Sequence, residues 1–174
     1  ASSTASITPK AVTLSGLTAA NKVYDGTTTA TVAHSGATFT GLVTGDTVTA
    51  SGTTGTFGTK QVGTGKTVTL SGTTYGGADA GNYTFTDQSS TTAAITAKAA
   101  TLSGLTAADK VYDGTTAATD AHSGARFSGP VAGDTVTASG TTGTFATKQV
   151  GTGKTVTLSG TTYGGADAGN YTFT

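Results

Sequence analysis

The stretch Gly-Thr-Gly-Lys-Thr at 63–67 recurs at 151–155 and contains the residue types that bind nucleotide phosphates. A phosphate-binding loop also needs a Gly five residues before its Gly-Lys pair, so that the backbone can wrap the phosphate, and a helix after it. Lys60 occupies that Gly position, and the residues that follow alternate hydroxyl and apolar side chains, as half-buried strands do. We therefore expect no nucleotide site. We expect a turn at 63–65, and we expect Lys66 to keep the entrance of the following strand solvated and unpaired with neighbouring strands.

The histidines and carboxylates are not spaced like those of an active site. His34 and His122 each precede a Ser, and neighbours on a strand point to opposite faces, so neither can activate that Ser. Most Asp residues lie beside Gly or in turn-rich stretches, where a carboxylate is solvated rather than held as a general acid. We expect no catalytic residue and no enzymatic activity.

Asp79 and Asp167 are the best candidates for a metal ligand, because each lies in a Gly-rich stretch that could add backbone carbonyls. Ca²⁺ takes about six to eight oxygens and usually several carboxylates. We therefore expect these Asp residues to lie in ordinary turns, with no metal or other cofactor, and keep calcium as the alternative. A self-formed crosslink between Lys and Asn or Asp, or between Thr and Gln, stays open and would remove one ammonia from the intact mass.

Threonine and glycine dominate the composition, with 45 and 27 of 174 residues. Thr favours strands and Gly favours turns, and Glu and Met are absent, so long helices are not expected. The net charge is zero and the cations are spread singly, which argues against nucleic acid or a membrane surface as partner. The absence of Cys excludes a disulfide framework. No apolar run approaches the roughly 20 residues that span a bilayer.

The chain is an internal repeat with a period of 88 residues. Residues 11–86 and 99–174 differ at nine of 76 positions. We expect residues 1–10 to be the end of a preceding module or a shared strand, 11–97 to be repeat 1, and 98–174 to be repeat 2. These near-identical modules are expected to be one another's partners.

The module boundary predicts an open sheet edge. Ser-Ile-Thr-Pro-Lys-Ala at 6–11 resembles Ala-Ile-Thr-Ala-Lys-Ala at 94–99. If this segment is the last strand of its module, then repeat 2 lacks that strand, and an unpaired edge is a template for pairing. We expect residues 4–10 of a neighbouring chain to fill it, which is self-association through an edge strand.

The period is too long for a solenoid coil of about 20–45 residues, but it fits a small β-sandwich of about seven short strands. We expect an all-β fold, made of two tandem Ig-like antiparallel β-sandwich modules in an elongated rod. Where Thr alternates with an apolar residue, one face of the strand should be buried. The expected strands of the first module are 11–15, 19–24, 28–33, 46–51, 53–57, 66–71, 81–86 and 92–97.

Two motifs carry a family resemblance. Asn-Lys-Val-Tyr-Asp-Gly-Thr-Thr-Thr-Ala-Thr at 21–31, with its copy at 109–119, resembles the YDG-type repeat of large bacterial exoproteins. The endings Gly-Ala-Asp-Ala-Gly-Asn-Tyr-Thr-Phe-Thr at 77–86 and 165–174 are similar to the same family and to the related MBG-type repeats. The resemblance implies tandem β-sandwich modules of secreted adhesins, often filamentous-haemagglutinin-like proteins exported by two-partner secretion. It implies no catalytic residue.

The family-motif residues are expected to be structural. Each Tyr should bury its ring and bond its hydroxyl, each Asp should bond the backbone of the Thr after the turn, and each Asn should end a turn. These residues are Tyr24, Asp25, Gly26, Tyr112, Asp113, Gly114, Asn82 and Asn170.

The expected function is a non-enzymatic structural or stalk repeat of a bacterial adhesin, which extends or assembles an adhesive fibre at the cell surface or in the biofilm matrix. The alternative is a repeat that itself binds polysaccharide, with repetition supplying multivalency. Sugar sites commonly present an exposed aromatic ring near a carboxylate. The candidates for that role are Tyr75 with Asp79, and Tyr163 with Asp167.

Overall fold

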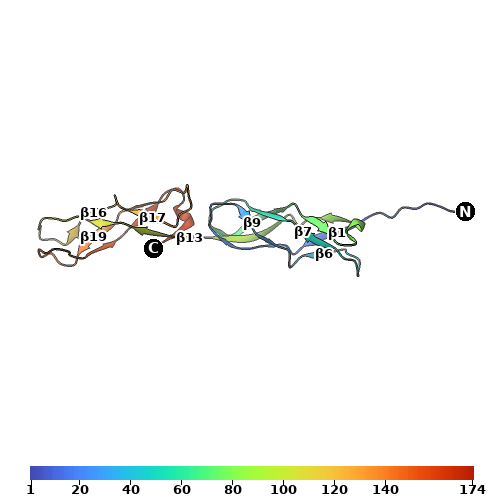
Figure 1. Cartoon of the computed structure of the whole chain (residues 1–174), viewed down its shortest axis with the longest axis horizontal. Coiled ribbons are helices and arrows are strands. Elements are labelled where there is room, and N and C mark those ends of the chain that lie inside the picture. Colours follow the sequence, from blue (N-terminus) through green and yellow to red (C-terminus); the bar gives the residue numbers. More distant parts are fainter. The chain divides into compact units, whose positions relative to one another are not determined.

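The computed structural model describes the backbone of all 174 residues and every side chain except that of Ala121. The chain divides into two compact units: unit 1 is Ala1–Val23 with Thr27–Thr96, and unit 2 is Tyr24–Gly26 with Ala97–Thr174. Figure 1 shows the strands of unit 1 from blue to green and those of unit 2 from yellow to red. The all-β prediction is confirmed, since the regular structure consists of strands and two short 3-10 helices. Neither described helix is long and apolar enough to cross a membrane.

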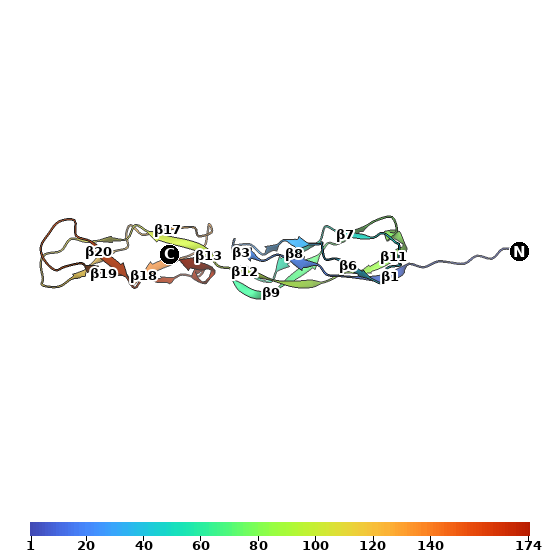
Figure 2. The same ribbon diagram turned by 90° about the horizontal axis from the view of Figure 1, so that it is seen from below.

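Unit 1 contains four sheets. Their strand orders are β11-β1-β6, β10-β7, β2-β5 and β3-β12-β9-β8-β4. In the last of these sheets, β12, near the end of the unit in sequence, lies between β9 and β3, which is near its start, as Figure 2 shows. The elements are β1 (Lys10–Ser15), β2 (Thr18–Ala19), β3 (Lys22–Val23), β4 (Thr29–Ala30), β5 (Val32–Ala33), β6 (Thr38–Thr40), β7 (Thr49–Ser51), β8 (Thr54–Phe57), β9 (Gly63–Ser71), β10 (Thr74–Gly76), η1 (Ala80–Asn82), β11 (Tyr83–Thr86) and β12 (Ser90–Thr96).

Unit 2 repeats most of this arrangement, in the strand orders β17-β13-β22, β14-β16, β18-β21 and β15-β19-β20. Its largest difference is in the last sheet, which has three strands where the corresponding sheet of unit 1 has five. The elements are β13 (Lys98–Ser103), β14 (Thr106–Ala107), β15 (Ala117–Ala118), β16 (Asp120–Ala121), β17 (Arg126–Ser128), β18 (Thr137–Ser139), β19 (Thr142–Phe145), β20 (Val156–Ser159), β21 (Thr162–Gly164), η2 (Ala168–Asn170) and β22 (Tyr171–Phe173).

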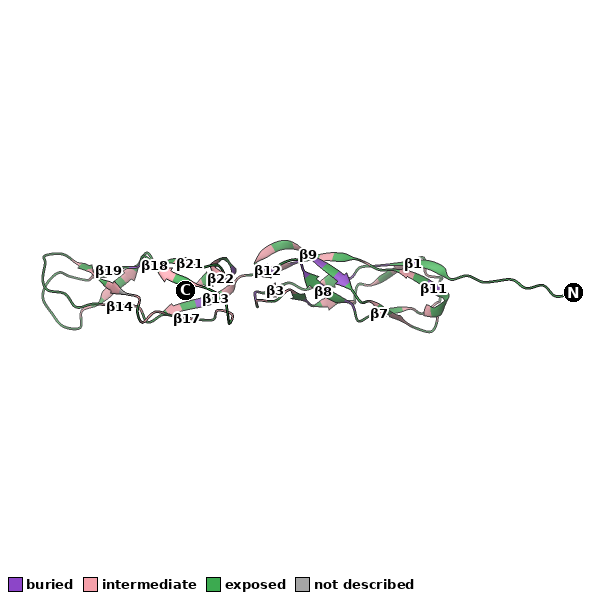
Figure 3. Cartoon of the chain, turned by 90° about the horizontal axis from the view of Figure 1, so that it is seen from above, coloured by how far each residue is buried: buried purple, intermediate pink, exposed green. Residues whose placement is uncertain are grey.

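The alternation of Thr with apolar residues builds the core of unit 1. On β1, Val12 and Leu14 are buried while the residues between and beside them are exposed. On β9, Val68 and Leu70 are buried while their Thr neighbours are exposed. This period of two is the expected consequence of a strand with one face against the core. Figure 3 shows the buried segments as purple patches on the strands.

Several expectations for the strands are corrected. The predicted turn at 63–65 is the start of β9, where Gly63 pairs with Ile95 of β12, a strand that comes later in the sequence. Strands β6 and β10 were not expected, since each is only three residues long. The pairing is also not purely antiparallel: β1 runs parallel to β11, and β12 runs parallel to β3.

Gly16 is required where the chain turns after β1. It has a φ of 81°, and a Cβ placed there would lie 2.1 Å from the carbonyl oxygen of Gly36. Gly45 has a similar φ of 99° but open space around its Cβ position. Replacing each glycine by alanine therefore distinguishes two contributions to the loss of stability. Gly45 reports the left-handed backbone alone, and Gly16 reports the left-handed backbone together with the steric clash.

We expect Gly16→Ala to lower the free energy of unfolding of unit 1 by more than about 2 kcal/mol, and Gly45→Ala by about 1–2 kcal/mol. The larger loss reflects the two backbones that must move apart. Chemical denaturation of the two variants beside the parent chain measures both values. Equal losses would show that the contact between residues 16 and 36 opens without cost.

Candidate functional site

A buried tyrosine bonded to a carboxylate occurs in both units. The Tyr83 hydroxyl on β11 donates to Asp46 and accepts from the Val43 amide at 3.2 Å. In unit 2, the Tyr171 hydroxyl on β22 donates to Asp134 at 2.6 Å and accepts from the Val131 amide at 2.8 Å. Both rings are buried. These phenols therefore tie the turn before β7 or β18 to the strand that follows the 3-10 helix.

The same contacts shift the titration of these phenols. Burial and the hydrogen bond to Asp134 raise the pKa of Tyr171 to about 12. The hydrogen bond to Asp46, followed by burial, raises the pKa of Tyr83 above its ordinary value. An ionised phenolate beside a carboxylate would place two negative charges together, so the neutral phenol is the folded form.

We expect unit 2 to lose stability as the pH rises from about 10 toward 12. The pKa of Tyr171 is higher in the folded than in the unfolded state, so its contribution is complete below the unfolded value and disappears through the folded one. Ultraviolet titration of phenolate in the parent chain and in Tyr171→Phe isolates this group. A Tyr171 that ionises at its ordinary pH would contradict the bond to Asp134.

The two Tyr-Asp-Gly motifs lie in different surroundings. Tyr24, which is counted with unit 2, is buried, donates to Asp134 at 2.8 Å and lies edge-on to Tyr171, with ring centroids 5.6 Å apart. Tyr112 is 58% exposed. The expected burial of the motif ring is therefore found for Tyr24 and not for Tyr112.

Asp113 behaves as the sequence predicted for a turn carboxylate. Its Oδ1 accepts from the Thr115 amide and from the Thr115 hydroxyl, each at 2.9 Å. The Lys110 ammonium, 2.8 Å away, is the largest cause that lowers the pKa of Asp113 to about 2. Gly114 follows with a φ of 79°, and Gly26 takes a φ of 78° after Asp25. The motif is thus a tight turn that needs its Gly.

The candidate glycan residues have internal contacts. The Tyr75 ring stacks on Phe85 with centroids 3.8 Å apart, and its hydroxyl donates to Asp87, while burial is the first cause that raises its pKa. Tyr163 stacks on Phe173 with centroids 4.1 Å apart. Both Tyr side chains are half-buried, so one ring face is already occupied.

The two candidate calcium ligands each hold a backbone amide. Asp79 Oδ2 accepts from Thr47 at 2.7 Å, and Asp167 Oδ2 accepts from Thr135 at 2.9 Å. Asn82 and Asn170 end the 3-10 helices that follow these Asp residues. Among the described residues, His, Cys, Asp and Glu form no group of three that could hold a metal ion.

The strand entrance at Lys66 is paired with a neighbouring strand, contrary to the expectation that Lys66 would keep it unpaired. The Lys66 ammonium donates to the Thr59 hydroxyl at 2.7 Å, and the residue pairs with Ala93 of β12. Its copy, Lys154, donates to the Thr147 hydroxyl at 2.7 Å. The lysine of each Gly-Lys-Thr stretch therefore donates its hydrogen bond to a threonine of the same unit.

Unit 2 contains an Asp–His–Thr arrangement that the sequence reasoning missed. His122 Nδ1 lies 3.1 Å from Asp120 Oδ2, and its Nε2 lies 3.1 Å from the Thr141 hydroxyl. Unit 1 has Val32 in place of Asp120, and keeps the contact between His34 and its own Thr. Thr141 is 5% exposed, and its hydroxyl also forms a hydrogen bond with the hydroxyl of Thr161. The Thr141 hydroxyl therefore links two segments of unit 2 and is not an accessible nucleophile.

Two near-identical all-β modules that hold themselves together by the same internal hydrogen bonds define a tandem-repeat protein. The chain belongs to the YDG domain family, whose profile matches twice, over residues 8–93 and 96–174. No curated protein and no solved structure matches the chain.

Proposed function

We propose that this chain is a non-enzymatic structural repeat of a secreted bacterial adhesin, whose Ig-like β-sandwich modules extend or assemble the adhesive fibre outside the cell. The observation that carries the proposal is that the polar side chains of both units form hydrogen bonds within their own unit. The Tyr–Asp, Asp–amide and His–Thr contacts recur in both units and bond one strand or turn to another. Residues used in this way are not presented to a substrate.

Repetition supports the same proposal. A module copied with nine changes in 76 positions adds length or number, not a new activity. Its neutral, Thr-rich surface carries little charge to attract other macromolecules. Two-partner secretion and a place at the cell surface or in the biofilm matrix are parts of the proposal that rest on the family alone.

Binding of the whole chain to a broad panel of bacterial and host polysaccharides tests the proposal. A structural repeat is expected to bind none of them when circular dichroism shows it folded. The alternative, a module that binds polysaccharide, predicts saturable binding that Tyr75→Ala with Tyr163→Ala abolishes. Because both rings stack on Phe residues, a loss of binding counts only if the double variant keeps its strand content.

A further inference from the structure

Three residues of repeat 1 belong to unit 2. Tyr24–Gly26 are counted with unit 2, although Val23 before them and Thr27 after them are counted with unit 1. These three residues are the Tyr-Asp-Gly motif, and a turn alone does not explain why the motif begins with a tyrosine. Tyr24 is 1% exposed, and its side chain contacts Asp134 and Tyr171 of repeat 2.

The site that receives the Tyr24 side chain is a carboxylate with two phenol donors. Asp134 Oδ2 accepts from the Tyr24 hydroxyl at 2.8 Å and from the Tyr171 hydroxyl at 2.6 Å. Hydrogen bonds to an ionised carboxylate are stronger than those between neutral groups. The Tyr171 hydroxyl also accepts from the Val131 amide at 2.8 Å, so repeat 2 itself orients the ring that Tyr24 meets edge-on. We call Val131, Asp134 and Tyr171 the acceptor site.

Gly26 brings the backbone of the motif against the same site. A Cβ at Gly26 would lie 2.9 Å from Cγ1 of Val131, which is closer than side chains normally approach. The φ of 78° at Gly26 also lies in the left-handed region that favours glycine. Two of the three motif residues therefore contact the acceptor site, Tyr24 through its side chain and Gly26 through its lack of one.

The turn that carries Tyr24 is held by other residues. The Lys22 ammonium donates to the Thr27 carbonyl at 3.0 Å and to the Thr27 hydroxyl at 2.9 Å. The same ammonium lies 5.8 Å from the centre of the Phe57 ring. A phenol has one proton to donate, and Tyr24 donates it to Asp134.

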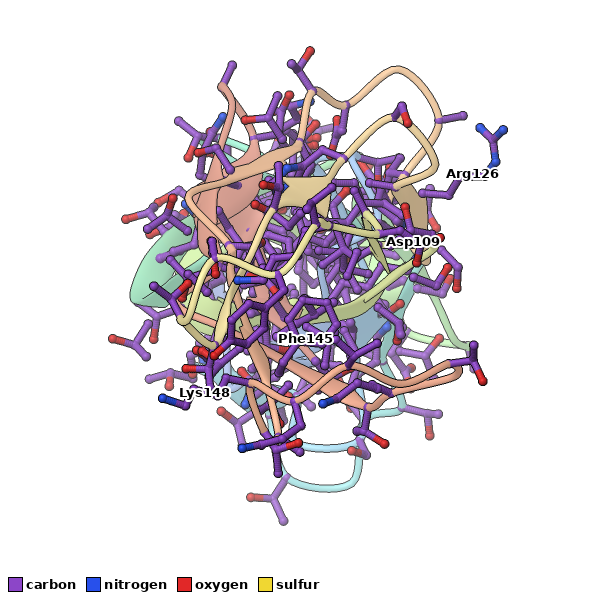
Figure 4. The ribbon with its side chains drawn as sticks, turned by 90° about the vertical axis from the view of Figure 1, so that its left-hand side faces the viewer. Asp109, Arg126, Phe145 and Lys148 are labelled. Carbon is purple, nitrogen blue, oxygen red and sulfur yellow. The ribbon has the colours of Figure 1, made fainter. Side chains whose placement is uncertain are left out.

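The second copy of the motif holds its turn in the same way. Lys110 donates to the Thr115 carbonyl at 3.1 Å and to the Thr115 hydroxyl at 3.0 Å, and its ammonium lies 5.8 Å from the centre of the Phe145 ring. Figure 4 shows Phe145 pointing into unit 2. Because a lysine, a threonine and a phenylalanine hold the turn in both repeats, the tyrosine is available for a partner outside the turn.

We propose that the Tyr-Asp-Gly motif is a docking element for the following repeat: Tyr24 and Gly26 bind the acceptor site, so the stability of unit 2 depends on residues of repeat 1. Coupling between neighbouring repeats is a main source of stability in tandem-repeat proteins. Such docking rests on the structural role proposed above, and it can be tested without polysaccharide, so the two proposals can fail separately. Each repeat contains both halves, since the acceptor residues Val131, Asp134 and Tyr171 have the copies Val43, Asp46 and Tyr83.

Tyr24→Phe tests the docking, because it keeps the ring and removes only the hydroxyl whose proton Asp134 accepts. It is expected to lower the folding equilibrium constant of unit 2 roughly tenfold, and the melting midpoint of unit 2 by about 5–10 °C. Tyr24 lies between β3 and β4 in the sequence, so a purely local role would weaken unit 1 instead.

Scanning calorimetry measures the two midpoints, and hydrogen exchange assigns them to the units. Tyr83→Phe is the matched control, because it removes the phenol bond to Asp46 and should destabilise unit 1 alone. A Tyr24→Phe chain that loses stability in unit 1, or in neither unit, would overturn the proposal.

A double-mutant cycle separates the docking contact from a general loss of stability. Tyr24→Phe combined with Asp134→Ala is expected to lower the folding equilibrium constant roughly tenfold less than the product of the two single effects, because their shared bond is lost only once. The matched cycle of Tyr24→Phe with Asp46→Ala should be additive, since Asp46 bonds Tyr83 of its own repeat. Urea denaturation of all variants, each checked for strand content by circular dichroism, gives the constants. Additive effects in both cycles, or equal coupling in both, would contradict the docking.

Discussion

On heating at low concentration, the chain is expected to unfold in two steps, with unit 2 melting at least about 10 °C below unit 1. Phe57, Val68 and Leu70 are buried in unit 1, and their identical copies in unit 2 are only half-buried. Each partly uncovered side chain of this size forfeits on the order of 1 kcal/mol, and 1 kcal/mol shifts the midpoint of a domain this small by about 4–8 °C. Phe57, Val68 and Leu70 have identical copies in unit 2, but buried Val12 is replaced there by buried Ala100, and this smaller side chain lowers the stability of unit 2 in the same direction.

Scanning calorimetry measures the two transitions, and hydrogen exchange assigns them. Amides of β19 and β20 should exchange before those of β8 and β9, which occupy the same places in unit 1. A single cooperative transition with equal exchange in both pairs of strands would contradict the expectation. It would mean that the partial exposure of these core side chains costs unit 2 no stability.

Ile95→Ala is expected to destabilise unit 1 by about 2–5 kcal/mol and to lower the upper transition accordingly. Ile95 is 1% exposed near the end of β12, and truncating it leaves a cavity in the core of unit 1. Ile7→Ala is the matched control, because Ile7 is likewise followed by Thr in the sequence but is fully exposed. At a concentration where the chain is monomeric, it should leave both transitions unchanged.

The comparison has a clear failing outcome. If Ile95→Ala moved the upper transition no further than Ile7→Ala does, β12 would not be the strand that closes unit 1.

The strands were predictable where Thr alternates with an apolar residue. At 66–71 and 11–15 the period of two identified both the strand and its buried face. The start of β9 was not predictable, because Gly-Thr-Gly favours a turn and forms a strand there only by pairing with β12. Parallel pairing between distant segments, such as β1 with β11, leaves no local signal at all.

The side-chain contacts were less predictable than the strands. Asp113 was recognised because its partner, Thr115, lies two residues away. The bond between Tyr83 and Asp46 joins residues far apart in sequence, and only their joint recurrence in the second module hinted at it. The glycan-binding roles of Tyr75 and Tyr163 stay predictions. The stacking of these two rings on Phe85 and Phe173 could not be inferred from their spacing in the sequence.

The parallel pairings in unit 1 also bear on how the unit folds. Lys10 pairs with Tyr83, and Lys22 pairs with Ile95, so residues near the start of the unit meet residues near its end. Such topologies have a high contact order, which makes folding slow, because long loops must close before these distant pairings form. A chain that is still being synthesised therefore cannot complete this unit until β12 has emerged from the ribosome.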